Sequence, residues 1–198
     1  DPDLQKIHGE PFRVSPEPTQ KRTFCQGFLQ EANVFTSYSA ILPPMKLIIL
    51  NGPCGVGKST VAKLLHKEMP LSFLLDIDAQ AQFLSHFREY PEQRWEVTQA
   101  IARSILESCF ALGRTVIVDK MVYDAATLDV YEEIAKKAGA EVVEFILWAP
   151  KEVVMERMKN RTWGDGSYLT PDRCEWFWDE MVKLKEKRPE AHIIDAAE

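Results

Sequence analysis

The chain has 198 residues, a formal net charge of −6 and 45% hydrophobic residues, which are the proportions of a folded globular protein. An acidic chain argues against bulk electrostatic binding to nucleic acid or to an anionic membrane, because both need a surplus of lysine and arginine. No run approaches the roughly 18 apolar residues of a membrane span, and the four cysteines lack C-x-x-C or zinc spacing, so we expect a cytoplasmic protein with reduced thiols.

Residues 1–44 differ in character from the rest of the chain. Prolines punctuate this stretch, and no sustained helical or alternating pattern runs through it. We expect an N-terminal extension that is irregular or non-native, followed by one domain over residues 45–198.

From Met45 onward, short apolar runs alternate with amphipathic stretches of helical length. This is the pattern of βα units around a parallel sheet, so the predicted fold class is α/β with five parallel strands and helices on both faces. The expected strands are Lys46–Leu50, Ser72–Ile77, Thr115–Asp119, Val142–Trp148 and His192–Asp195.

Three helices are predicted from apolar spacing and capping signals. The first carries an apolar stripe that ends before Gly113, and the second ends before Gly139, with Asp124 as its N-cap. Thr170 and Pro171 indicate the start of the last helix. The stripe of the first helix consists of Val97, Ile101, Ile105, Cys109 and Leu112.

A glycine-rich loop follows the first predicted strand. Gly52 to Ser59 match the P-loop pattern G-x-x-x-x-G-K-[ST], and a helical apolar pattern continues from there to Pro70. Glycines let successive backbone N–H groups point at one anion, and the helix N-terminus adds its partial positive charge. A glycine-rich turn with a chance lysine is the alternative.

The loop predicts a bound nucleotide and a magnesium ion. Lys58 can reach the β- and γ-phosphates, and the Ser59 hydroxyl can ligate Mg²⁺. The residues expected to bind the nucleotide are Gly52, Gly55, Val56, Gly57, Lys58, Ser59 and Thr60.

Carboxylates follow the second and third predicted strands. Asp76 and Asp78 are two residues apart, so on a strand they would share one face at the carboxyl end of the sheet, where one could serve magnesium and the other an incoming hydroxyl. In the alternative interpretation, Asp78 caps a helix and Asp76 is a solvated strand end. Asp119, at the end of the third predicted strand, is placed as a metal-shell acid, and a plain turn residue is the alternative. Lys120 could meet phosphate or pair with Asp119.

From Met45 to its end, the chain resembles the small P-loop kinases related to nucleoside-monophosphate kinases. The group includes shikimate and gluconate kinases, antibiotic phosphotransferases, polynucleotide-kinase-like enzymes and zeta-type toxins. The resemblance rests on the loop Gly52–Ser59, the pair Asp76-x-Asp78, Asp119 and the segment APKEVVMERMKNR.

The resemblance implies a helix after the fourth strand that carries arginines into a small mobile lid, here about residues 161–172. Arg157 and Arg161 match that placement and, four residues apart, share one helix face. They would converge on triphosphate oxygens. Surface arginines paired with Glu152 or Glu156 are the alternative.

Aromatic residues gather around the predicted lid. They could line an acceptor pocket or stack on a base, although packing is the commoner use of such side chains. They are Trp163, Trp176, Phe177 and Trp178.

Together these patterns predict an ATP- and Mg²⁺-dependent phosphotransferase acting on a hydroxyl of a small molecule. The residues assigned to catalysis are Lys58, Asp78, Arg157 and Arg161, and those assigned to the metal are Ser59, Asp76 and Asp119. Arg88, Arg94 and Arg103 would suit an anionic acceptor, and solvated helix faces explain them equally well.

Two alternatives stand beside this prediction. A nucleoside or nucleotide kinase is the nearest. A nucleotide-gated switch with slow hydrolysis belongs to another class, and the chain lacks the guanine-reading N-K-x-D motif of GTPases. The sequence leaves the oligomeric state open.

Overall fold

The structure is a computed structural model that describes residues 44–159 and 170–197. These residues belong to one compact unit of the chain, Val34–Glu198. The predicted N-terminal extension therefore lies outside the described residues, apart from Pro44.

Five strands form one parallel sheet, as the sequence predicts, and the structure shows their order to be β2-β3-β1-β4-β5. The strands are β1 (Lys46–Asn51), β2 (Phe73–Asp76), β3 (Val116–Asp119), β4 (Glu141–Trp148) and β5 (His192–Asp195). The described helices are α2 (Lys58–Glu68), α3 (Ile77–Ala81), α4 (Pro91–Ala111), α5 (Ala125–Lys137), α6 (Lys151–Lys159) and α7 (Pro171–Lys187).

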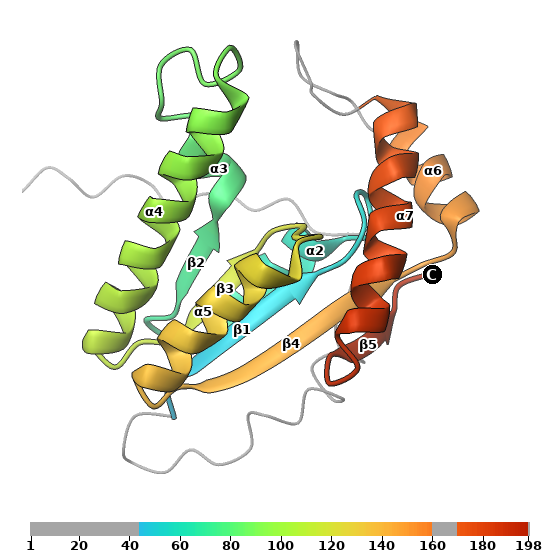
Figure 1. Ribbon diagram of the computed structural model, residues 1–198. Helices are drawn as coiled ribbons and strands as arrows, with labels where there is room; N and C mark the ends of the chain where they lie inside the picture. The colour runs from blue at the N-terminus through green and yellow to red at the C-terminus, as the bar shows by residue number, and fades with distance from the viewer. Residues whose placement is uncertain (1–43, 160–169, 198) are drawn as a thin grey trace, which may run out of the picture. The chain divides into compact units, whose positions relative to one another are not determined.

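Helices cover both faces of the sheet (Figure 1). On one face, residues of α4, α5 and α7 pack with Leu47 and Ile49 of β1 in the main hydrophobic core. The alternate residues of β1, Ile48 and Leu50, are equally buried, because they point to the opposite face, where α2 lies. Burial on both faces explains why the central strands β1 and β3 read as short continuous apolar runs, whereas the edge strands β2 and β5 are partly exposed.

The capping predictions are confirmed. The Asp124 carboxylate accepts the backbone N–H groups of Ala126 and Thr127, and the Thr170 hydroxyl accepts that of Arg173. Helices α4 and α5 are followed by glycines with positive φ, Gly113 and Gly139.

The predicted strand Ser72–Ile77 is too long, and this changes the placement of the two following carboxylates. β2 ends at Asp76, and Ile77 already begins α3. Asp76 is the N-cap, since its Oδ1 accepts the Ala79 N–H at 2.9 Å. Asp76 and Asp78 therefore do not share one strand face, and the residue that caps the helix is Asp76 instead of Asp78.

The apolar stripe predicted for α4 lies beside the fully buried face of the helix, and Ile105 and Cys109 of the stripe pack against the main core while only partly buried. The buried residues of the helix are Thr98, Gln99, Ala102, Leu106 and Phe110. The Thr98 hydroxyl donates to the Arg94 carbonyl, and the Gln99 Oε1 accepts from Tyr131 Oη at 2.5 Å, so both of these oxygens have a partner on the buried face, whereas the Gln99 Nε2 has none among the described residues.

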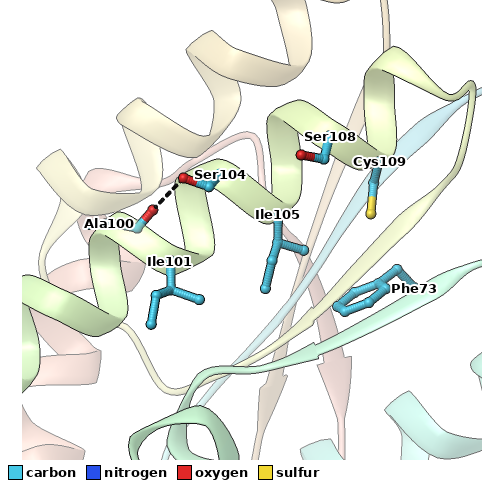
Figure 2. Close-up of a pocket in the computed structure, with 7 residues that line it drawn as sticks. All are labelled: Phe73, Ala100, Ile101, Ser104, Ile105, Ser108 and Cys109. Carbon is cyan, nitrogen blue, oxygen red and sulfur yellow. Dashed lines mark hydrogen bonds between the residues drawn. The ribbon is translucent and has the colours of Figure 1, made fainter. Parts of the chain in front are cut away.

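The stripe also borders an apolar groove on the flank of α4 (Figure 2). The groove has a volume of about 450 Å³, and Phe73 of the edge strand β2 forms its opposite wall. Its lining is Phe73, Ala100, Ile101, Ser104, Ile105, Ser108 and Cys109. Because this lining carries no charged side chain, the groove is not suited to binding phosphate.

Within the described ranges, no helix combines the length and apolar character needed to cross a membrane.

Candidate functional site

The loop between β1 and α2 needs glycine at specific positions. Gly52 has φ 135°, and a Cβ there would lie 2.3 Å from the carbonyl oxygen of Leu147 on β4. Gly55 has φ 74°, and its Cβ would lie 2.7 Å from Met158 Sδ on α6. A side chain at Gly52 would collide with the backbone of β4, whereas at Gly55 the positive φ is the stronger reason for glycine, because the Met158 side chain can move.

The loop ends in the N-terminus of α2. Gly57 is the N-cap, with φ 106° and no side-chain cap, and its carbonyl accepts the Thr60 and Val61 N–H groups. The first turn of α2 contains no acidic residue. Ser59 is exposed and Thr60 half-buried, whereas Val56 is buried and serves packing. Free amides and the helix dipole make this end of α2 suited to an anion.

Lys58 lies folded back on the loop. Its Nζ donates to the carbonyls of Gly52 and Pro53, both at 2.9 Å. Burial lowers the pKa of the Lys58 ammonium, and the carboxylates of Asp119 and Asp78 oppose that shift. An anionic ligand in the loop would offer this ammonium stronger partners than two neutral carbonyls.

Asn51 fixes the loop to the neighbouring strand. Its Oδ1 accepts the Gly52 N–H at 2.8 Å and the Val122 N–H at 3.0 Å, and its Nδ2 donates to the Val122 carbonyl at 2.9 Å. This fully buried amide thus joins the start of the loop to the segment after β3. Our sequence analysis did not single out Asn51, although a polar residue at the end of an apolar strand was the available signal.

Two carboxylates meet at the ends of β2 and β3. Asp76 and Asp119 are register partners on these adjacent parallel strands. Burial raises the pKa of Asp119, and a hydrogen bond from Ser59 and the charge of Lys58 lower it. The structure therefore brings Ser59 and Asp119 together, and their role as metal ligands stays a prediction.

These oxygen donors fit magnesium. Mg²⁺ prefers hard oxygen ligands, keeps several waters and takes one or two carboxylates together with substrate phosphates. In the part of the chain that the structure describes, no cluster of three or more His, Cys, Asp or Glu side chains is arranged to hold a metal by itself. Ser59 and Asp119, with Asp76 beside them, would hold the ion only in company with phosphate oxygens.

Asp78 lies beyond this pair in the first turn of α3, and it is bound by Lys120. The Lys120 ammonium donates to Asp78 Oδ1 in an ion pair. The sequence analysis considered Asp119 as the carboxylate partner of Lys120, and the ion pair that the structure shows is with Asp78 instead. A phosphate partner for Lys120 stays a prediction.

Arg157 lies on α6 beside the loop, next to the Met158 that contacts Gly55. Its guanidinium donates to the carbonyls of Ala196 and Ala197, at 2.6 and 3.1 Å. It therefore holds α6 to the segment that follows β5. Arg161 and most of the predicted lid, residues 161–169, lie outside the described residues, so their placement stays a prediction.

The predicted aromatic group divides into two clusters. Trp176 and Phe177 contact Tyr123, which follows Val122, with ring centroids 5.4 and 5.7 Å from the Tyr123 ring. Tyr123 and Trp176 are nearly half exposed. Trp178 packs elsewhere, on Trp148 of β4, and Trp163 lies outside the described residues.

Comparison with known proteins agrees with this geometry. A protein-family model described as an AAA domain matches residues 47–177, which includes the loop, the three carboxylates and Arg157. No curated protein sequence matches the chain.

Solved structures show the same fold at low identity. A gluconokinase from Sinorhizobium meliloti 1021 is 19% identical with a TM-score of 0.54, covering 79% of this chain and 85% of its own. Shikimate kinase from Aquifex aeolicus is 20% identical with a TM-score of 0.52, covering 76% and 86%. The PezAT toxin-antitoxin system of Streptococcus pneumoniae is 15% identical with a TM-score of 0.58, covering 89% and 75%. The fold is therefore that of P-loop kinases.

Proposed function

Because the chain belongs to the AAA domain family, whose model matches residues 47–177, we propose that it transfers the γ-phosphoryl group of ATP, with Mg²⁺, to a hydroxyl of a small molecule. One observation carries the proposal. The phosphate loop and three carboxylates gather at the carboxyl ends of β1, β2 and β3, where open α/β sheets bind ligands.

Each group has a role that its position supports. Loop amides and Lys58 neutralise the terminal phosphates, and Arg157 and Arg161 would add charge from the side of α6 and the lid. Ser59 and Asp119 hold Mg²⁺, which supplies further charge neutralisation when bound.

Asp78 is proposed to orient the acceptor hydroxyl and to receive its proton. Its side chain is the most exposed of the three carboxylates, whereas Asp119 is buried and Asp76 is engaged as the cap of α3. A general base has to reach the acceptor's proton. With Asp78 as the base, the less accessible Asp76 serves as the cap of α3 and Asp119 as the metal ligand.

The test is transfer of labelled γ-phosphate from ATP to a panel of hydroxylated metabolites, nucleosides and antibiotics. An acceptor should be phosphorylated by the wild-type protein, and Asp78→Asn should reduce turnover about 10²- to 10⁴-fold, the usual contribution of a general base, while ATP still binds. If ATP is consumed only by water, at one rate whatever is added, the proposal is wrong.

A nucleoside or nucleotide kinase is the second candidate, and the exposed rings of Tyr123 and Trp176 favour it. Asn51 clamps Val122, so Tyr123 is held at a fixed place relative to the phosphate loop. Rings so placed can stack on a base. In the same panel, preference for nucleosides over sugars, lost in Trp176→Ala, would support this candidate.

A further inference from the structure

Lys120 lies between the donor and the acceptor side of the proposed site. The phosphate loop follows β1, Asp78 follows β2, and β3, which ends next to Lys120, is the strand between them. Neighbouring strands are about 4.8 Å apart, so the two sides are separated by roughly 10 Å. A phosphoryl group moving from the loop toward Asp78 must cross the end of β3.

The Lys120 ammonium lies at the end of β3, and the burial of the rest of its side chain limits how far it can move. That side chain is only 15% exposed, whereas its partner Asp78 is 76% exposed. The buried stem restricts where the ammonium can go, and the carboxylate is the more mobile member of the pair. Lys120 is also near enough to Lys58 for its charge to contribute to the lowered pKa of Lys58. An anion between these two ammoniums would be attracted by both.

The charges of the described site make this cation important. Three carboxylates face two ammoniums, those of Lys58 and Lys120, so these five side chains carry a net charge of about −1 before the Arg157 guanidinium on α6 is counted. Without Lys120 the charge would be about −2, and a polyphosphate would approach a more strongly repelling surface.

We propose that Lys120 is a further catalytic residue, which binds Asp78 in the free protein and contacts the phosphoryl group while it is transferred. The inference rests on the proposed function. In the step, the bond between the γ-phosphorus and the bridging oxygen breaks and its electron pair stays on ADP. The acceptor oxygen bonds to the phosphorus and its proton passes to Asp78. Charge on the equatorial oxygens attracts the ammonium, which releases the Asp78 carboxylate for the proton.

The test needs no acceptor, so it remains informative if no acceptor is found. Affinity for Mg²⁺–ADP is measured by titration calorimetry with and without aluminium fluoride, which imitates the phosphoryl group in transit. Lys120→Met should weaken the aluminium fluoride complex about 10- to 100-fold, as expected for a lost charge-assisted contact, and change Mg²⁺–ADP affinity less than about threefold. Lys120→Arg should recover most of the loss.

Two control variants make the test decisive. Lys137→Met removes an exposed lysine paired with Glu133 on α5 and should change neither affinity. Asp78→Asn removes the charged partner of Lys120, so the affinity for the aluminium fluoride complex should stay the same or increase. This measurement remains informative even if Lys120→Met does not fold. The inference is overturned if Lys120→Met weakens both complexes equally or neither, if Asp78→Asn weakens the complex as much as Lys120→Met, or if aluminium fluoride adds no affinity in the wild-type protein.

Discussion

Replacing Arg188 with methionine should destabilise the protein strongly, because one guanidinium joins three elements. Its Nε donates to Glu144 Oε2 of β4 and its Nη1 to Asp129 Oδ1 of α5, both at 2.8 Å, and its Nη2 donates to Glu132 of α5. Arg188 itself is the residue that ends α7. The change would separate the end of α7 from α5 and the sheet.

The magnitude follows from burial. Asp129 is 65% exposed, so its pair with Arg188 contributes less than about 1 kcal/mol. Glu144 is 6% exposed and Arg188 13%, and breaking such a buried pair costs about 3–5 kcal/mol, because a charge is left without its partner. We therefore expect a loss of about 3–5 kcal/mol in the free energy of unfolding at pH 8.

The loss should depend on pH. Burial raises the pKa of Glu144 to about 7, above its unfolded value. A carboxyl with a raised pKa favours the folded state at low pH and loses this contribution as pH rises from about 4.5 through 7. Without Arg188, burying the ionised Glu144 carboxylate costs still more free energy. The variant therefore avoids this cost only at a pH where Glu144 is protonated. The loss at pH 5.5 should be smaller than at pH 8.

Urea unfolding at both pH values, followed by circular dichroism, measures the effect. Lys183→Met, which removes a solvent-exposed pair with Glu180 on α7, is the matched control and should cost less than about 1 kcal/mol. Adding Glu144→Gln to Arg188→Met should restore part of the stability at pH 8. A loss below about 1 kcal/mol at pH 8, or one equal at both pH values, would refute the reasoning.

Three further predictions concern the loop and the core. Lys58→Ala should weaken Mg²⁺–ATP binding about 10- to 100-fold in titration calorimetry, since charge-assisted hydrogen bonds are lost. Gly52→Ala should abolish nucleotide binding in the same assay, because its Cβ would lie 2.3 Å from the Leu147 carbonyl oxygen; retained affinity would contradict the loop geometry. Tyr131→Phe leaves the buried Gln99 oxygen unpaired and should cost about 1–3 kcal/mol in urea unfolding. Because burial raises the pKa of Tyr131 to about 12, wild-type stability should fall between pH 10 and 12, and the variant should lack that fall.

The centre of the sheet could be predicted from the sequence because strands β1 and β3 are buried on both faces. Runs such as Lys46–Leu50 and Thr115–Asp119 read as continuous apolar segments, and the structure extends or shortens them by one residue. The loop was predictable for a related reason. Gly52 and Gly55 are required by the local backbone conformation and contacts of the loop, so the glycine spacing in the sequence is enough to predict the shape of the loop.

The structure corrects the prediction where contacts between distant residues decide. The buried face of α4 holds Thr98 and Gln99, whose side-chain oxygens pair with the Arg94 carbonyl and with Tyr131 Oη. The apolar spacing of the helix gave no sign that polar residues would be buried there. The boundary between β2 and α3 is set by Asp76 as cap, a choice that two nearby carboxylates leave open in the sequence. The Lys120–Asp78 pair joins residues 42 positions apart, beyond the reach of local pattern.

An acidic chain can still bind a polyphosphate, because the relevant charge is local. Electrostatic interactions at physiological salt extend about 8 Å, so distant carboxylates contribute little at the loop. Some of them are also partly compensated in place: Arg188 binds three carboxylates, and Lys151 binds Glu175 and Asp179. At the loop itself the attraction comes from backbone amides, the α2 dipole and Lys58. Since amides carry no counterions to release, nucleotide affinity here should depend on salt less steeply than binding to a basic surface patch does.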